Sequence, residues 1–371
     1  MPYRPRDIYR GRRKFRVPLT IFLFVLAGLL IGAVALFYGL QQYLVYDQTG
    51  VRLELPFMQS GDAEQVSDAA SAEPSPTLEP VIVQVIYEEP DFSEVDLGGW
   101  ESLSESRTRF VPIADAVDET KLASAVAAAA SGDFTGIVLQ LKDESGQLAW
   151  ASTCELAAAY GTSGTMDYTE TVAALHEKGL TAAAQISCCA DALMARRNWP
   201  VTLQTLGGGA YQDEDGVYWL DPYNRSIRGY LIDLMGELTA MGFDEIILAD
   251  LYHPVSEEAF SYSVTLQTEP DPVVAVCQMG QRLAESLSGT ETAVSVRIDT
   301  DSLRDGLGAQ TGQDIDIFWR LFARLYCPTS PEAAASDLEL CADTMNGGAA
   351  ATRFVAVCEL VPEGMSSYMI E

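Results

Sequence analysis

Four aspartates, Asp143, Asp191, Asp250 and Asp299, each follow an apolar run that has the character of a strand. A carboxyl group can serve as a general acid, a general base or a nucleophile, and two carboxyl groups with different pKa values can divide these tasks. Asp250 is the strongest candidate because a wholly apolar run precedes it, and a charge cannot turn into an apolar layer without a heavy desolvation cost. The alternatives are a turn for Asp143 and a helix cap for Asp191.

The elements that must position these residues alternate along the chain between apolar runs and helical patterns, which is typical of repeated βα units around a parallel sheet. The predicted strands cover residues 110–113, 136–141, 181–187, 245–251, 293–298, 318–326 and 353–358. The predicted helices cover residues 119–130, 168–178, 226–241, 272–288 and 331–345. Seven strands in about 260 residues predict an α/β fold, a (β/α)8 TIM-barrel-like domain at residues 107–371 that lacks one strand.

The missing barrel position has one candidate, residues 81–87, whose sequence VIVQVIY has strand character. We expect this segment to enter before the first strand and to fill the gap. An open doubly wound sheet also fits the alternation, but no glycine-rich phosphate loop follows any strand. The three glycines at 207–209 precede no helical pattern, so we expect them in a loop at the barrel rim.

The N-terminal part predicts a membrane anchor. Residues 1–16 contain seven basic side chains and one acidic one, and residues 17–38 carry no charge. A helix of that length crosses a bilayer, and the positive-inside rule keeps its basic end in the cytoplasm. The sequence therefore predicts a cytoplasmic tail at 1–16, a transmembrane helix in the lipid bilayer at 17–46, and an extracellular C-terminal domain on a single-pass cell-membrane protein. The alternative is a signal peptide that is cleaved near residue 36.

Residues 47–106 are rich in acidic residues, serine, proline and alanine, which predicts a stalk between membrane and barrel. The net charge of -30 argues against nucleic acid as a partner. The chain has seven scattered cysteines and two histidines, a pattern that favours neither a disulfide framework nor a Cys/His metal site. We expect no metal and no cofactor.

Four motifs occur in a fixed order: KDESG at 142–146, HEKG at 176–179, WLDPY at 219–223 and GFDEI at 242–246. With this order of motifs, the chain resembles the bacterial putative glycoside hydrolases that have an α-amylase-like TIM barrel. The resemblance implies cleavage of a glycosidic bond by two carboxyl groups that are about 5 to 9.5 Å apart. It makes Asp250 the first catalytic candidate, with Asp191 or Asp299 as the second. The candidates for substrate binding are Asp143, Gln140, Gln185, Trp219, Tyr223, Tyr252, His253 and Arg297.

Four positions depart from the pattern of that family. Gln140 stands where the family has an aspartate, Gln185 where it has an arginine, and Arg297 where it has an acid; the fourth-strand aspartate falls on Ala249, with Asp250 one place later. Two hypotheses therefore stay open. One is an active hydrolase of a cell-envelope or environmental polysaccharide, and the other is a catalytically lapsed barrel that binds glycans or organises the envelope. Both have a carbohydrate polymer or oligosaccharide as the partner.

Overall fold

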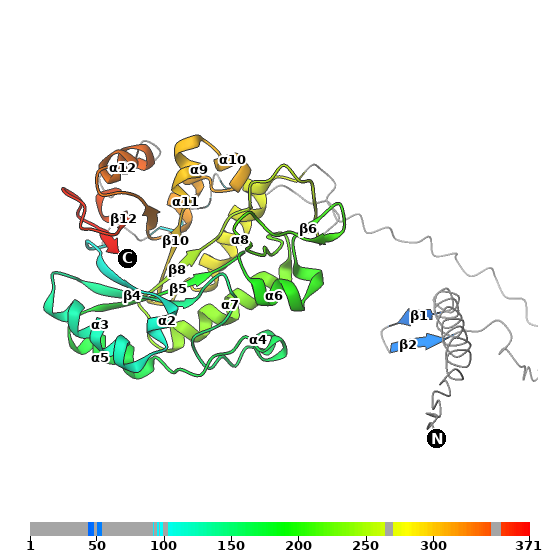
Figure 1. Cartoon of the computed structure of the whole chain (residues 1–371), viewed down its shortest axis with the longest axis horizontal. Coiled ribbons are helices and arrows are strands. Elements are labelled where there is room, and N and C mark those ends of the chain that lie inside the picture. Colours follow the sequence, from blue (N-terminus) through cyan, green and yellow to red (C-terminus); the bar gives the residue numbers. More distant parts are fainter. Residues whose placement is uncertain are drawn as a thin grey trace, which may run out of the picture. The chain divides into compact units, whose positions relative to one another are not determined.

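The computed structural model describes residues 44–47, 50–53, 103–263, 270–342 and 350–371, together with Phe92, Val95, Leu97 and Gly98 (Figure 1). The chain forms two compact units, Met1–Val83 and Gln84–Glu371. In the first unit, strands β1 (Leu44–Asp47) and β2 (Gly50–Leu53) form an antiparallel hairpin in which Leu44 is the partner of Leu53. The last residues of the predicted span 17–46 are therefore strand. The described part of the chain contains no helix with the length and apolar character that a membrane span requires.

The tail at 1–16, most of the span 17–46, nearly all of the stalk at 47–106 and the segment 81–87 lie outside the described residues. The membrane anchor and the stalk therefore stay predictions.

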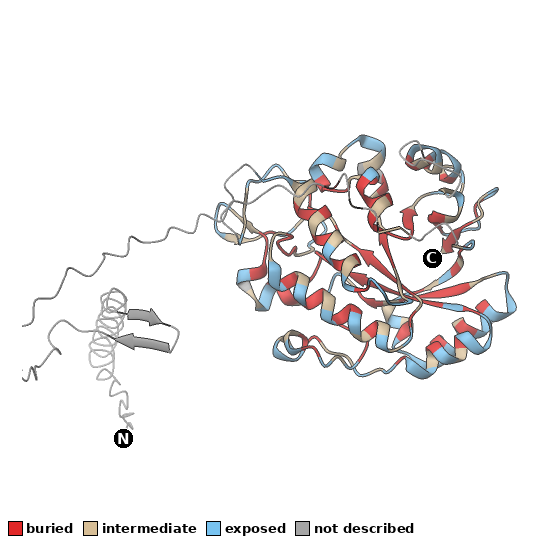
Figure 2. Ribbon diagram, turned by 180° about the vertical axis from the view of Figure 1, so that it is seen from behind, coloured by how far each residue is buried: buried red, intermediate tan, exposed pale blue. Residues whose placement is uncertain are grey.

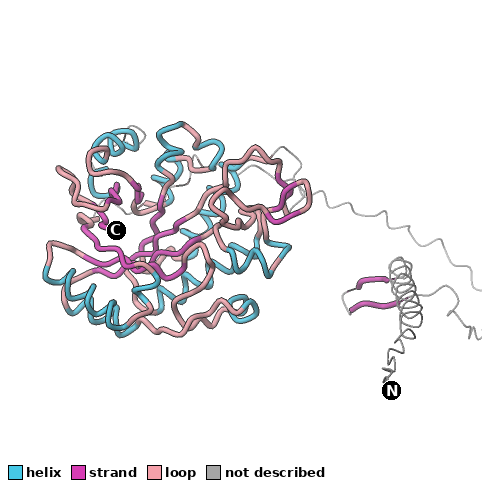
Figure 3. The backbone as a smooth tube through the Cα atoms, in the orientation of Figure 1, coloured by secondary structure: helices cyan, strands magenta, loops and turns pink. Residues whose placement is uncertain are grey.

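The second unit contains a closed barrel of parallel strands in the order β10-β11-β12-β13-β3-β4-β5-β8, which confirms the predicted TIM-like fold (Figure 3). The barrel strands are β3 (Arg107–Val111), β4 (Gly136–Lys142), β5 (Thr181–Ser187), β8 (Glu245–Ala249), β10 (Ala293–Arg297), β11 (Leu325–Pro328), β12 (Phe354–Cys358) and β13 (Tyr368–Ile370).

The barrel is complete, which corrects the expectation of a missing strand. Strand β13 pairs with β12 on one side and with β3 on the other, so it occupies the position proposed for residues 81–87. The prediction that residues 81–87 supply the missing barrel strand is therefore wrong. Three residues are too short for a periodic pattern, and only their pairing on both sides identifies them as a strand.

The predicted strand at 318–326 is also wrong in its first half. Residues Ile315–Leu321 form helix α11, whose N-cap Asp314 accepts a hydrogen bond from the Ile317 amide at 3.0 Å. The strand β11 begins at Leu325. Helix α11 is buried on several faces, and a short apolar run of this kind cannot be distinguished from a strand by periodicity alone.

Helices pack around the strands, with buried faces toward the barrel and exposed faces toward solvent (Figure 2). Several have acidic N-caps; Asp118 caps α3, and Asp271 caps α8 with Pro272 at the first helical position. The helices of this unit are α2 (Ile113–Ala116), α3 (Glu119–Ser131), α4 (Glu155–Tyr160), α5 (Thr169–Glu177), α6 (Ala192–Arg197), α7 (Arg225–Ala240), α8 (Pro272–Ser286), α9 (Thr300–Asp305), α10 (Gly308–Thr311), α11, α12 (Ala334–Ala342) and α13 (Ala350–Arg353).

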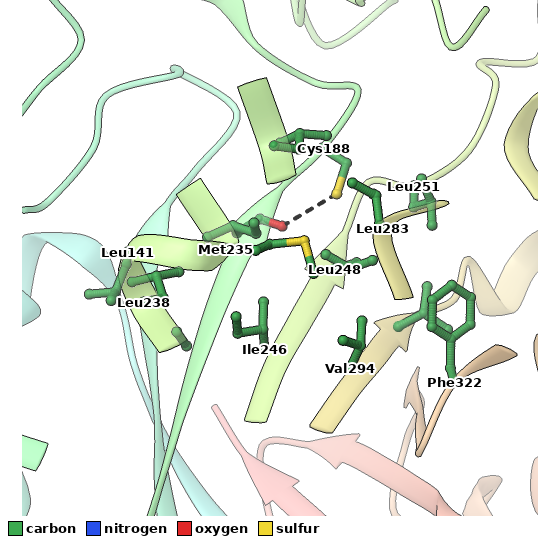
Figure 4. Close-up of a cluster of buried hydrophobic side chains, with 14 of the residues drawn as sticks. Leu141, Cys188, Met235, Leu238, Ile246, Leu248, Leu251, Leu283, Val294 and Phe322 are labelled. Atoms are coloured by element: carbon green, nitrogen blue, oxygen red, sulfur yellow. Dashed lines mark hydrogen bonds between the residues drawn. The ribbon is translucent and has the colours of Figure 1, made fainter. Parts of the chain in front are cut away.

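The apolar core has two parts because successive strand residues point to opposite faces. The outer part lies between strands and helices; Figure 4 shows one cluster of this part, to which strands β8 and β10 contribute Leu248 and Val294 and helices α7 and α8 contribute Leu238 and Leu283. The inner part fills the barrel with Val138, Ala183, Ile247, Tyr326, Val355, Val357 and Met369. The inner residues identify which strand positions face the barrel axis.

Loops after β5 and β8 add a small sheet of three strands, β6 (Gln204–Thr205), β7 (Gly209–Ala210) and β9 (Phe260–Ser261). The three glycines at 207–209 lie at the turn between β6 and β7, where Gly208 has a φ of +83°. They belong to the loop that follows β5 on the rim, as expected.

Candidate functional site

A cavity of about 210 Å³ lies at the carboxyl ends of β8, β10 and β11, which is the end where TIM-barrel enzymes place their active sites. Its lining consists of Asp250, Tyr252, Arg297, Ile298, Asp299, Thr300 and Pro328. Two aspartates predicted from the sequence, Asp250 and Asp299, therefore meet in one cavity.

Asp250 lies directly after β8 in a left-handed backbone conformation, with a φ of +52°. No other non-glycine residue in the described part of the chain has a positive φ. The strand ends at Ala249, so the alternation of side chains no longer applies to Asp250, and its half-buried side chain lines the cavity. This local bend explains how a shift of one place from the family pattern still leaves a carboxyl group at the barrel mouth. Strained backbone of this kind clusters at functional sites.

Burial raises the pKa of Asp250 above its ordinary value because a carboxylate is poorly solvated there. The Ser187 hydroxyl and the positive charges of Arg297 and Lys142 act in the opposite direction, and Glu144 acts in the same direction as burial. The net effect favours the protonated carboxyl group, which is the form that a general acid requires.

Asp299 is held near Asp250 by a buried glutamine, Gln313. The Gln313 side-chain oxygen accepts a hydrogen bond from the Asp299 amide at 2.7 Å, and its side-chain nitrogen donates to the Leu251 carbonyl at 3.2 Å. One side chain thus joins the segment after β10 to the segment after β8. The sequence did not identify Gln313, because no strand or motif marks it.

Arg297, predicted as a substrate-binding residue, lines the cavity and pairs with Glu371. Arg297 Nη1 lies 2.6 Å from Glu371 Oε1. The sequence analysis also missed Glu371, which directly follows the short strand β13. Recognition of that strand would have placed Glu371 at the barrel mouth.

Asp191 does not line the cavity and has a structural role. Its side chain is fully buried, Oδ1 accepts a hydrogen bond from the Met194 amide at 2.7 Å, and Oδ2 lies 2.9 Å from Lys142 Nζ. A Cβ atom at Gly146 would lie 1.9 Å from Oδ1, so the loop after β4 packs directly on this carboxylate. The capping alternative therefore fits the geometry better than the catalytic assignment.

The partner of Asp191 is a fully buried lysine. Burial alone would lower the pKa of Lys142, but the adjacent Asp191 carboxylate, together with Tyr230 and Cys188, raises it, so the ammonium group stays charged. Lys142 Nζ also donates to the Ser187 carbonyl at 2.7 Å. The pair fixes the ends of β4 and β5 beside the cavity.

Asp143, Gln140 and Gln185 do not line the cavity. Asp143 Oδ1 accepts hydrogen bonds from the amide and the hydroxyl of Ser145, as the turn alternative predicts. Gln140 Oε1 accepts a hydrogen bond from the Ile113 amide at 3.2 Å. Gln185 is buried, and its Oε1 has no hydrogen-bond partner.

Among the predicted aromatic residues, Tyr252 lines the cavity and Trp219 packs behind it, with ring centroids 4.8 Å apart. Trp219 is buried, and its Nε1 donates to Asp213 Oδ2 at 2.8 Å, which fixes the ring. Tyr252 thus presents a supported aromatic surface to the cavity.

Tyr223 and His253 belong to the loop structure next to the site. Tyr223 packs against Tyr262 with centroids 5.0 Å apart, and its hydroxyl donates to the Asp271 carbonyl at 2.9 Å. His253 is buried, with Nε2 3.0 Å from the Tyr262 hydroxyl, and burial lowers the pKa of His253 to about 4. These contacts stabilise the cavity wall.

Asp221, in the motif WLDPY, caps no helix. Its Oδ2 accepts hydrogen bonds from the Ser263 amide and hydroxyl, both at 2.6 Å, and the N-cap of α7 is Asn224. Asp221 therefore ties the loop after β8 to the loop after β5.

Within the described ranges, no three His, Cys, Asp or Glu side chains are grouped so that they could hold a metal ion.

Comparison with known proteins adds the lineage. Residues 109–318, more than half of the chain, match the family model described as "Putative glycosyl hydrolase domain". The glycoside hydrolase domain of PgaB (BpsB) from Bordetella bronchiseptica has a similar structure, with a TM-score of 0.53 and 12% identity over 72% of this chain and 94% of that one. A hypothetical protein from Ruminiclostridium thermocellum ATCC 27405 has a TM-score of 0.46 and 19% identity over 50% of this chain and 95% of that one. The sequence matches none of the curated proteins.

Proposed function

The chain belongs to the putative glycosyl hydrolase family, and from this we propose that it hydrolyses a glycosidic bond with Asp250 and Asp299 as the reacting carboxyl groups. The observation that carries the proposal is the meeting of these two aspartates in one cavity at the carboxyl ends of the strands. Glycoside hydrolysis needs two such groups on either side of the scissile bond.

The two aspartates take different roles because their surroundings differ. Asp250, with its raised pKa, holds the proton that it donates to the glycosidic oxygen as the bond breaks. Asp299, at the opposite side of the sugar, acts as the carboxylate that activates water or attacks the anomeric carbon. The separation of the two carboxyl groups on the bound sugar decides between inversion and retention of configuration.

Tyr252 binds the sugar ring in this proposal. Its ring is held by Trp219, so little side-chain freedom is lost when a pyranose stacks on it. The net charge of -30 repels polyanionic glycans, so we expect a neutral or cationic polysaccharide as the substrate.

The proposed substrate is a polysaccharide of the cell envelope or of the environment. This part of the proposal rests on the sequence, because residues 17–38 carry no charge and follow a basic segment. A barrel on a stalk outside the membrane would meet such polymers directly.

A second function, glycan binding without hydrolysis, is favoured by one observation. Gln140 and Gln185, two positions where the family resemblance implies charged residues, carry no charge and can neither ionise nor donate a proton as an acid. A barrel of this kind would bind oligosaccharides at Tyr252 and release no product.

Turnover assays separate the two functions. The full-length protein is incubated with peptidoglycan, chitosan and starch, and released oligosaccharides are identified by mass spectrometry. We expect wild-type product from at least one polymer, and a loss of about 10²–10⁴-fold in Asp250→Asn and Asp299→Asn. The matched control is Asp133→Asn, a surface aspartate whose side chain is 88% exposed. Wild-type binding without product would support the second function, and equal turnover in all four proteins would contradict the assignment of the site.

A further inference from the structure

The guanidinium group of Arg297 places a positive charge in the same cavity as Asp250 and Asp299. Glu371 holds this group with two contacts, Nη1 to Oε1 at 2.6 Å and Nη2 to Oε2 at 3.4 Å. Paired contacts between a guanidinium and a carboxylate fix orientation as well as position. The direction in which Arg297 presents its charge is therefore set by Glu371.

The two residues come from different sides of the barrel. Arg297 ends β10 and Glu371 follows β13, and strands β11 and β12 separate β10 from β13 in the barrel. Both side chains face the axis: each lies two residues beyond an inward residue, and the Glu371 amide still donates to the Cys358 carbonyl at 3.1 Å, so the alternation of β13 extends to Glu371. The inward residues are Ser295, which bonds to Glu245 inside the barrel, and Met369 of the inner core. The ion pair thus closes across the barrel mouth.

We propose that Glu371 is a positioning residue, which engages the Arg297 guanidinium from the far side of the barrel mouth and keeps its charge from pairing with Asp250 or Asp299. The inference rests on the proposed function, because it concerns the protonation of the proposed acid. A positive charge within about 4–6 Å typically lowers the pKa of an aspartate by 1–3 units. Released from Glu371, Arg297 would lower the pKa of Asp250 and favour its carboxylate form over the form that donates a proton.

Other groups near Asp250 do not take over this role. Lys142 also favours the ionised form, but its ammonium group is already paired with Asp191 at 2.9 Å. The remaining polar or titratable groups that influence Asp250, or that line the cavity with it, are Ser187, Glu144, Asp299, Thr300, Tyr252, Cys188 and Cys189. Of the two cations that act on Asp250, Lys142 and Arg297, only Arg297 is paired with Glu371, the residue that follows β13.

The test is a pH titration of Asp250 in the full-length protein. The titration is monitored by NMR of ¹³C-carboxyl-labelled aspartate. The Asp250 signal is identified by its loss in Asp250→Asn. We expect Glu371→Gln to lower the titration midpoint by about one pH unit or more. Arg297→Gln should raise the midpoint, and the double variant should match Arg297→Gln, because Glu371 acts on Asp250 through Arg297. Glu285→Gln, which breaks the exposed pair of Arg282 and Glu285 on α8, is the control and should change nothing.

An unchanged midpoint in Glu371→Gln, or a lowered midpoint in Arg297→Gln, would overturn the proposal. If Glu371→Gln does not fold, Glu371→Asp tests the proposal, because the shorter side chain cannot keep both contacts with Arg297 and should also lower the midpoint. The titration needs no substrate. A protein without turnover would therefore refute the hydrolase proposal and leave the midpoints as an independent result.

Discussion

Gln140 of β4 and Gln185 of β5 are register partners on neighbouring strands. The family resemblance implies an aspartate at the first position and an arginine at the second. Glutamine at both positions therefore removes two opposite charges from adjacent positions, and no buried charge is left without a partner. Glutamine at only one of the two positions would leave the charge at the other position without its partner.

This relationship predicts coupled stabilities. Gln185→Arg should lower the free energy of unfolding by about 3 kcal/mol or more, because it buries a charge without a partner. Adding Gln140→Asp should restore most of the loss. Urea denaturation of the two single variants and the double variant measures the coupling. A double variant as unstable as Gln185→Arg would contradict the pairing.

The buried pair of Lys142 and Asp191 predicts a large stability effect. Asp191→Asn leaves a fully buried ammonium group without its counter-charge, so we expect a loss of about 3–5 kcal/mol in the free energy of unfolding. Lys142→Met together with Asp191→Asn should lose less than Asp191→Asn alone. The exposed pair of Arg282 and Glu285 is the control, and its disruption should cost less than about 1 kcal/mol. A cost for Asp191→Asn no larger than that of the control would return Asp191 to the list of catalytic candidates.

His253 predicts how stability depends on pH. Its pKa is lowered to about 4 in the folded protein and is about 6.5 in an unfolded chain. Between these values the unfolded state binds a proton that the folded state does not. The contribution of neutral His253 to the free energy of unfolding is therefore fully present above about pH 6.5. It is lost as the pH falls toward 4, at about 1.4 kcal/mol per pH unit.

Urea denaturation between pH 4 and pH 7 measures this effect. We expect His253→Phe to flatten the profile relative to the wild type. The same slope in His253→Phe and in the wild type would show that His253 is solvated in the folded protein.

The sequence predicted the barrel and its first five strands because their apolar runs are long and flanked by helices. It missed β13 because three residues carry no period, and it extended β11 backward because helix α11 is apolar on several faces. The two errors had a common consequence. Without β13, the side chain of Glu371 had no position at the barrel mouth.

The candidate site was predicted in part. Asp250 and Asp299 were identified because each follows a strand that ends at the same face, and parallel strands bring such residues together. The role of Asp191 could not be decided from the sequence, since a cap and a catalytic residue have the same sequence context; its burial against Lys142 favours the cap. Gln313 could not be predicted, because its function depends on two backbone groups that only the fold brings together.

The predicted topology leads to a test on intact cells. Protease added outside should remove the barrel and spare the basic tail at residues 1–16, because the positive-inside rule keeps that tail in the cytoplasm. Immunoblots against the two ends measure this, with a cytoplasmic protein as the control for cell integrity. Protection of the barrel would contradict the orientation, and a released protein that begins near residue 36 would indicate a cleaved signal peptide.

The most direct measurement of the central claim is a crystal structure of Asp250→Asn with an oligosaccharide bound from the polymer that the assays select. We predict a sugar stacked on Tyr252, with the scissile oxygen within hydrogen-bond distance of the side chain at position 250 and the Asp299 carboxylate on the opposite side of the anomeric carbon. An oligosaccharide bound on the sheet of β6, β7 and β9, with the cavity empty, would contradict it.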